Sequence, residues 1–364
     1  MSCSILNSTP FRASTFPDKS IEGAPTQVLI VKGTWQISVG RLLAPHHQAP
    51  IRFMDETIPL GDLPLDVAQR VVISGRESED WVRYESDYCP PKDRFDLIVN
   101  AWIQCAGNRY SRMESMVDFD GQCLMTLIAR APRVWIPGLL APVIKELSPD
   151  VCKVPAFNVF AYGGPANRPV PIAELPQGTA SKVIEHWHLN QEGMGYCTSA
   201  SQSNAVPLPW VESSKSPIHF WSDRPPVTAL GHISRADQSR QRMPPDRSRE
   251  QDVGNVKEHS VDRGHFNSAP RPLQLNDAPQ PGSVVDLWNL SQSGHCRFQF
   301  PDIHLWAMGE DRAGRRRVPV KLVWDTLLLE PELDSAELVW RAELTDPGHQ
   351  LSSITLIARS GGSN

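Results

Sequence analysis

Alternation of polar and apolar residues near the end of the chain limits the possible fold more than any other feature. In SAELVWRAEL, residues 335–344, one set of alternate positions is wholly apolar: Ala336, Leu338, Trp340 and Ala342. The intervening positions are mostly charged: Glu337, Val339, Arg341 and Glu343. Successive side chains of a β-strand point to opposite faces, so this period of two predicts a strand with two unlike faces.

Other segments predict further strands and two tight hairpins. In VLIVKGTWQISVG, residues 28–40, an unbroken apolar run precedes an alternating one, which is typical of a strand covered first on both faces and then on one. Residues 95–102, FDLIVNAW, read similarly. Asp120-Gly121 and Ser293-Gly294 each lie between strand-like segments, and such dipeptides are strong hairpin signals.

Helical patterns are scarce, and the chain has 33 prolines against 23 glycines. GLLAPVIKELSPD, residues 138–150, is compatible with one short helix, although Pro142 lies near its start. We therefore expect a mainly β protein, built as an antiparallel sandwich or as barrel-like sheets, with long irregular loops and little helix.

Composition along the chain suggests one main unit between two tails. Residues 1–21 are expected to form a flexible N-terminal tail, and residues 347–364 a C-terminal tail. The domain between them, residues 22–346, is one unit or two β lobes, about 22–150 and 151–346. Residues 235–264 are charged and poor in apolar side chains, which predicts a solvated loop.

Charge and cysteine usage exclude several classes of protein. The net charge of −5 argues against nucleic acid as a partner, and no apolar stretch approaches the length of a membrane span. Seven cysteines without a CxxC pair argue against a disulfide framework. With no secretory-type N-terminus, the chain is expected in the cytoplasm. The arginines at 312 and 315–317 leave two interpretations open, a solvated turn or a phosphate or partner contact.

A search for catalytic motifs finds no strong candidate and implies no cofactor. His186 and His188 lie two residues apart, so on a strand both imidazoles would face one side and could bind a metal; the alternative is ordinary surface histidines. Cys89 precedes two prolines and is expected to be exposed, but it is a weak candidate nucleophile because no histidine lies near it in sequence. Asp118 and Asp120 are better explained by a hairpin turn than by acid–base catalysis.

Several segments, in their order along residues 25–345, resemble one known family. They are VLIVKGTWQI, DYCPPKDRFDLIVNAWIQCAGN, HWHLNQEGMGY, AVPLPWVE, HFNSAPRPLQL, PGSVVDLWNLSQSGHCRFQFP and WDTLLLEPELDSAELVWRAEL. Together they are similar to the type VI secretion accessory proteins defined by domain of unknown function 2169. The resemblance implies a bacterial adaptor or chaperone that loads an effector, or its PAAR-type tip, onto the secretion spike. It carries over no catalytic residue.

Two functional hypotheses follow from these observations. In the first, the chain is a non-catalytic cytoplasmic adaptor whose partners are proteins, and Trp187, Trp210 and Trp221 are the candidate contact residues; alternatively these rings only cover the sheet. A component retained in the assembled particle would look the same in sequence. In the second, the chain is a metal-dependent β-barrel or β-sandwich enzyme that uses His186 and His188.

Overall fold

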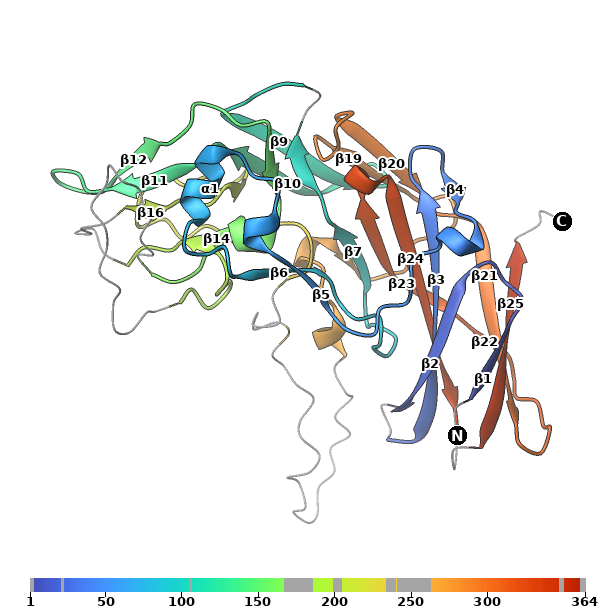
Figure 1. Ribbon diagram of the computed structural model, residues 1–364. Helices are drawn as coiled ribbons and strands as arrows, with labels where there is room; N and C mark the ends of the chain where they lie inside the picture. Colours follow the sequence, from blue (N-terminus) through green and yellow to red (C-terminus); the bar gives the residue numbers. More distant parts are fainter. Residues whose placement is uncertain are drawn as a thin grey trace, which may run out of the picture.

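Figure 1 shows the computed structural model, which describes residues 3–20, 23–104, 107–166, 186–198, 205–233, 240, 263–346 and 350–360. The prediction of a mainly β fold is confirmed, since the described residues hold one α-helix, α1 (Val67–Ile73), and several mostly antiparallel sheets. None of these sheets closes into a barrel within the described residues. The predicted solvated loop, 235–264, lies outside the described residues except for Arg240, Arg263 and Gly264.

The largest sheet has seven strands and contains the alternating segment 335–344. Its order is β18 (Gln274–Leu275), β7 (Phe95–Val99), β23 (Val323–Glu330), β24 (Ser335–Thr345), β3 (Pro25–Gln36) and β2 (Arg12–Lys19), with β4 (Arg41–Leu42) beside β3. β7 and β23 are parallel and the other neighbours antiparallel. Val28–Val31 of β3 are buried, which confirms that both faces of the strand are covered at that point.

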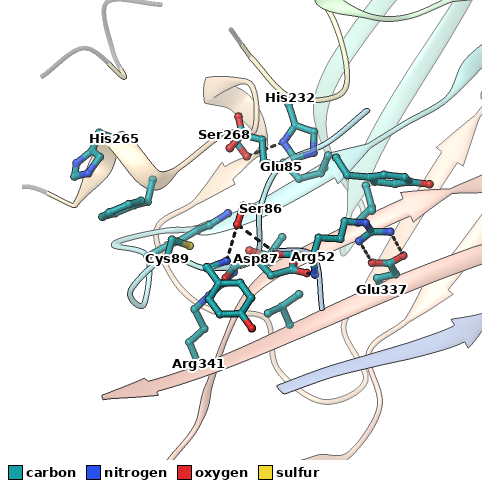
Figure 2. Close-up of a pocket in the computed structure, with 18 of the residues that line it drawn as sticks. Arg52, Glu85, Ser86, Asp87, Cys89, His232, His265, Ser268, Glu337 and Arg341 are labelled. Atoms are coloured by element: carbon teal, nitrogen blue, oxygen red, sulfur yellow. Dashed lines mark hydrogen bonds and ion pairs between the residues drawn. The ribbon is translucent and has the colours of Figure 1, made fainter. Parts of the chain in front are cut away.

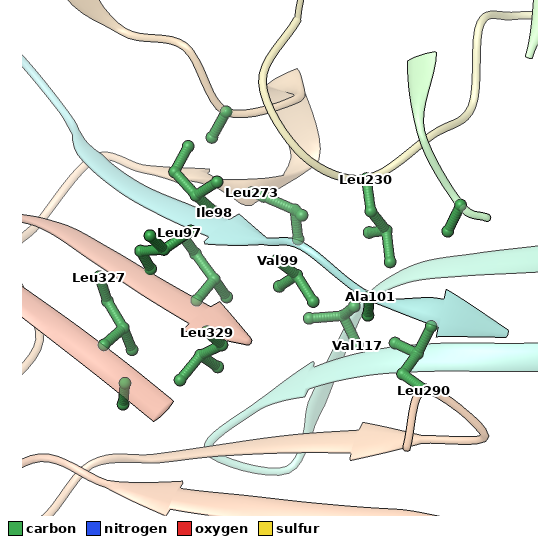
Figure 3. Packing of buried hydrophobic residues seen from close by; sticks show 14 of the residues in the cluster. Leu97, Ile98, Val99, Ala101, Val117, Leu230, Leu273, Leu290, Leu327 and Leu329 are labelled. Atoms are coloured by element: carbon green, nitrogen blue, oxygen red, sulfur yellow. The ribbon is translucent and has the colours of Figure 1, made fainter. Parts of the chain in front are cut away.

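A second sheet of five strands contains both predicted hairpins. Its order is β17 (Val211–Ser213), β10 (Gln122–Arg130), β9 (Arg112–Phe119), β19 (Val284–Trp288) and β20 (His295–Gln299). Asp120 and Gly121 join β9 to β10 with φ angles of 49° and 79°, the left-handed conformation that such a turn requires. The main core lies between this sheet and one face of the seven-stranded sheet. Figure 3 shows Leu97, Val99, Leu327 and Leu329 packed together, with Val117 nearby.

The predicted terminal tails were wrong, because both ends of the chain form strands. A four-stranded sheet joins them in the order β1 (Ser4–Asn7), β25 (Leu351–Ser360), β21 (Ile303–Asp311) and β22 (Val320–Lys321), with β1 parallel to β25. Phe11, Ile354 and Leu356 are buried in the main core. Their polar neighbours suggested flexibility, but backbone pairing with distant strands and this apolar burial order both ends.

The remaining strands form small sheets, which Figure 1 shows mainly at the end of the molecule that holds α1. These strands are β5 (Glu56–Pro59) with β6 (Asp80–Tyr84), β8 (Trp102–Gln104) with β13 (Lys153–Pro155), β14 (Tyr162–Gly163) with β15 (Met194–Gly195), and β12 (Val143–Glu146), β11 (Arg133–Ile136) and β16 (Val206–Pro207) in one sheet. Short 3-10 turns cover Pro45–His47, Leu60–Asp62, Asn158–Phe160, Gly264–Phe266, Arg271–Leu273 and Pro331–Leu333. A satellite apolar cluster supports this end: Trp135, Tyr162, Tyr196, Val206, Leu208 and Ile218.

Two details differ from expectation. Residues 138–150 form no helix: residues 137–142 make a loop and β12 follows, because Pro142 removes a backbone donor where a helix would need one. The two proposed lobes do not correspond to separate sheets, because β9 pairs with β19 and β7 with β23, each across position 150. The division into lobes stays a prediction.

Candidate functional site

The charged face of the seven-stranded sheet is buried. On β24, Leu338 and Trp340 face the main core, while Glu337 and Arg341 face the other way and are only 4% and 2% exposed. The register places Lys32 of β3 opposite Val339, also on this second face. Burying ionised groups is unfavourable unless each is paired and hydrogen bonded, so this face needs a layer that supplies partners.

Three irregular segments form that layer and leave a charged cavity of about 530 Å³ beneath it (Figure 2). The segments contain Arg52, residues 85–92 and residues 265–268, and Tyr84 of β6, His232 and Arg240 complete the layer. The cavity is lined by charged, polar and apolar side chains from this layer and from the sheet: Arg52, Tyr84, Glu85, Ser86, Asp87, Tyr88, Cys89, Lys92, Ile98, His232, Arg240, His265, Phe266, Ser268, Thr326, Leu328, Glu337, Val339 and Arg341.

Glu337 is the centre of the first ion-pair group. The guanidinium of Arg52 donates from both terminal nitrogens to its carboxylate, at 2.5 Å and 2.8 Å. The ammonium of Lys32, which is wholly buried, lies 3.1 Å from the same carboxylate and also contacts Asp87. The Arg52 guanidinium stands 3.7 Å from the centre of the Tyr84 ring. This geometry is the two-pronged pairing that makes an arginine–carboxylate contact strong.

Further ion pairs complete the network around the cavity. Lys92 Nζ lies 2.7 Å from Asp96, and the Ser268 backbone N–H donates to the same carboxylate at 2.8 Å. Arg341 pairs with Asp325 and Arg240 with Glu85. The buried network thus contains five cations and five carboxylates: Lys32, Arg52, Lys92, Arg240, Arg341, Glu85, Asp87, Asp96, Asp325 and Glu337; the half-exposed Glu56 lies at its edge, 3.5 Å from Arg52 Nε. Opposite charges therefore balance in number within it.

Burial changes the ionisation of several groups in the cavity. It raises the pKa of the Cys89 thiol, in spite of the nearby cations Arg341 and Lys92, so the thiol stays protonated at neutral pH. Burial alone would also raise the pKa of Glu337, but Lys32 and Arg52 outweigh it and hold that pKa at about 2. Burial lowers the pKa of His232 to about 4, so its imidazole is neutral at pH 7. The cavity therefore presents stable ions and an unactivated thiol.

Acid is expected to destabilise the protein in two successive ranges of pH. The pKa of His232 is lower in the folded chain than in the unfolded chain. Its contribution to the stability of the fold is therefore complete above about pH 6.5 and is lost as the pH falls from 6.5 to about 4. Glu337 also has a lowered pKa, and its contribution is lost as the pH falls from 4.5 towards 2. Urea unfolding at a series of pH values measures both. His232→Asn is expected to abolish only the loss of stability between pH 6.5 and about 4. If the free energy of unfolding of this variant still falls with pH as steeply as that of the wild type in this range, the assignment to His232 is contradicted.

The sequence-predicted histidines lie in irregular backbone and not on the regular strand that the hypothesis assumed. His186 makes an isolated bridge with Pro165 and His188 lies in the turn that follows, so the two are not on one regular strand, and both are exposed. No group of three or more His, Cys, Asp or Glu side chains suited to a metal occurs among the described residues. Cys89 was considered as an exposed thiol, but only 8% of it is exposed.

The three candidate tryptophans occupy different environments. Trp210 has no exposed surface, and its ring stacks on Phe160 with centroids 4.5 Å apart, so the prediction that it contacts a partner was wrong: the core accommodates this ring. Trp187 and Trp221 are half-buried and pack against the satellite cluster. These two therefore retain surface that a partner can reach.

The most exposed apolar side chains lie on a hairpin that the sequence did not reveal. We define the apolar hairpin as β11, the loop 137–142 and β12. Leu139 and Leu140 at its tip are fully exposed, and Val143 is about half exposed. β12 is an edge strand of its sheet in the described part of the chain. Clustered exposed apolar groups mark interaction sites more often than isolated ones do. The signal in the sequence is Pro137-Gly138, a turn pair directly before the segment that is compatible with a short helix.

The arginine cluster forms the loop between β21 and β22. Arg315 pairs with Asp311 at 2.9 Å and Arg316 with Glu310 at 3.4 Å, and both guanidinium groups are largely exposed. This arrangement favours the solvated-turn interpretation, because two of the arginines already form ion pairs with carboxylates next to the loop.

The fold and site together define a mainly β protein with a buried ionic face and an exposed apolar hairpin. The chain belongs to the family described as uncharacterized protein conserved in bacteria (DUF2169), whose model matches residues 22–341. The match confirms membership in domain of unknown function family 2169, and the family description assigns no role. No curated protein and no solved structure gives a significant match. No helix in the described residues is long and apolar enough to cross a membrane.

Proposed function

We propose that this chain is a non-catalytic adaptor that binds a type VI secretion effector, or its PAAR-type tip, and helps to load it onto the secretion spike. The proposal places the protein in the bacterial cytoplasm. Its first support is the family to which residues 22–341 belong and the role that the resemblance implies. The observation that carries it structurally is the exposed apolar hairpin.

The apolar hairpin has the properties of a protein-binding anchor. Leu139 and Leu140 would each transfer a whole side chain from water into a partner, which is worth about 1.5–3 kcal/mol per residue. The strands below the tip are held by four paired positions from Arg133 with Glu146 to Ile136 with Val143. A supported strand pair positions the tip better than a free loop would, and this reduces the entropy lost on binding.

Neighbouring aromatic residues can extend this surface. Trp135 of β11 belongs to the satellite cluster against which Trp187 and Trp221 pack, so one apolar unit supports the hairpin and both rings. Phe220, next to Trp221, is largely exposed. Interfaces commonly combine aromatic anchors of this kind with a polar rim. We therefore include Trp187 and Trp221 in the proposed contact surface and omit Trp210.

The chemistry of the charged cavity supports the non-catalytic part of the proposal. A thiol nucleophile requires a lowered pKa, whereas burial raises that of Cys89. The carboxylates Glu85 and Glu337 are held in ion pairs with pKa values of about 2, far from the range in which a general base works best.

Substituting both tip leucines tests the proposed surface. In Leu139→Asp/Leu140→Asp, partner binding is expected to weaken by at least about tenfold, because two anchors are lost and two charges must be desolvated. The stability of the free protein is expected to change by less than about 0.5 kcal/mol, since both positions are exposed. Co-purification with effector and spike proteins encoded nearby, followed by titration, measures the effect.

Leu333→Asp is the matched control, because Leu333 is also an exposed leucine but lies on the turn between β23 and β24, outside the proposed surface. It is expected to bind normally. Equal loss of binding in both variants would reject the hairpin as the contact. Failure of every effector and spike component to bind the wild-type chain would reject the adaptor function itself.

A further inference from the structure

The charged cavity has more hydrogen-bond donors than the network uses. A guanidinium offers five N–H groups and an ammonium three. Arg52 donates two to Glu337; its buried Nε has no hydrogen-bond partner among the described residues and lies 3.5 Å from a carboxylate oxygen of Glu56. Lys92 donates one to Asp96. Arg341 donates to Asp325 and to the Asp87 carbonyl oxygen. All three side chains are more than nine-tenths buried.

In the described part of the chain, three carboxylates on the same wall already hold donors. Both oxygens of Glu337 accept from Arg52, and both oxygens of Glu85 accept from Arg240. Asp87 accepts from the Arg52 backbone N–H at 2.7 Å and contacts Lys32. The cavity of about 530 Å³ therefore contains more cationic N–H donors than acceptors among the described residues. A ligand with acceptor oxygens would satisfy the remaining donors.

The rest of the cavity wall indicates what such a ligand carries besides oxygen. Tyr88, Phe266, Leu328 and Val339 line the same space and offer apolar contact. The volume lies within the range of small-molecule sites and far exceeds that of one bound water. We propose that the charged cavity binds a small organic anion whose carboxylate or phosphate group accepts hydrogen bonds from Arg52, Lys92 and Arg341. This inference is independent of the adaptor function.

Calorimetric titration of the full-length protein tests the proposal with benzoate, phenyl phosphate and benzamide. Benzoate and phenyl phosphate supply the two anionic groups, and benzamide is an uncharged molecule of nearly the same shape as benzoate. Saturable binding of at least one anion is expected, with no measurable binding of benzamide. The two anions together show which group the cavity prefers. Absence of saturable binding by both, or equal binding of benzamide, would overturn the proposal.

Two variants locate the binding. Arg52→Lys keeps a cation beside Glu337 but removes the planar donor set, and Lys92→Gln leaves Asp96 with its contacts to Asn267 and Ser268. Each is expected to weaken anion binding by about tenfold. Arg83→Lys is the matched control, since Arg83 pairs with Glu330 on the same sheet and does not line the cavity. Equal weakening in Arg83→Lys would contradict the assignment.

A measurement on the unmodified protein avoids any effect of substitution on folding. Cys89 lines the cavity, whereas Cys123 and Cys152 are exposed elsewhere. A saturating anion is expected to slow alkylation of Cys89, measured by mass spectrometry at alkaline pH, and to leave Cys123 and Cys152 unchanged. Unchanged alkylation of Cys89 at full occupancy would show that the anion binds somewhere else.

Discussion

Glu337→Ala is expected to destabilise the protein by about 3–5 kcal/mol, because it leaves two buried cations without their shared carboxylate. Lys32 has no exposed side-chain surface, and Arg52 has little. Neither side chain can reach water without opening the layer above the sheet. The substitution therefore costs the desolvation free energy of two unpaired cations in addition to the lost ion pairs. Urea unfolding of the variant and the wild type, extrapolated to water, measures the difference.

Glu310→Ala is the control for this prediction. Glu310 also pairs with an arginine, Arg316, but that pair lies at the surface, so its removal is expected to cost less than about 1 kcal/mol. The contrast isolates burial as the cause. Similar destabilisation by the two alanine variants would mean that the network on the sheet contributes no more than a surface pair.

Trp210→Ala is expected to destabilise the protein by about 3–5 kcal/mol through the cavity that it leaves. The Trp210 ring is fully buried and lies parallel to Phe160, with an interplanar angle of 6°. Any loss of partner binding in this variant should therefore follow from unfolding. Thermal and urea unfolding, measured beside binding, separate the two effects.

Trp221→Ala provides the comparison, because Trp221 is half-buried at the satellite cluster and belongs to the proposed contact surface. It is expected to lower stability less than Trp210→Ala and to lower binding more, per folded molecule. If Trp210→Ala kept its stability but lost its partner, Trp210 would be a contact residue and the structural assignment would be wrong.

Local sequence signals predicted the strands and turns well wherever neighbouring residues decide the conformation. The alternation of residues 335–344 became β24, and Asp120-Gly121 became the turn of the β9–β10 hairpin. Helix α1 was missed although its signal was present: Asp66 and Gln69 form a capping box, in which each side chain bonds the other's backbone N–H. A helix of seven residues makes only about two turns, which is too few for a period of 3.6 in the apolar residues to be recognised.

Local sequence patterns gave wrong predictions where segments distant in the chain determine whether a residue is buried or ordered. The N-terminal residues looked flexible because they are polar, yet β1 pairs with β25 from the opposite end of the chain. The two prolines that follow Cys89 favoured exposure, yet the covering layer buries this residue beside Arg341. Residues 87–89 and Lys92 therefore form part of the cavity wall, in the segment that leads into β7.

By itself, the sequence determined that residues 335–344 form a strand with one apolar face and one charged face, because a period of two follows from backbone geometry alone. Only the tertiary structure decided that the charged face is buried. That outcome depends on Arg52, Asp87 and Lys32, which lie roughly 250 to 300 positions away in the chain and meet Glu337 and Arg341 only after folding. Charge pairing across such distances has no local signature, since it requires the partners to share one low-dielectric space.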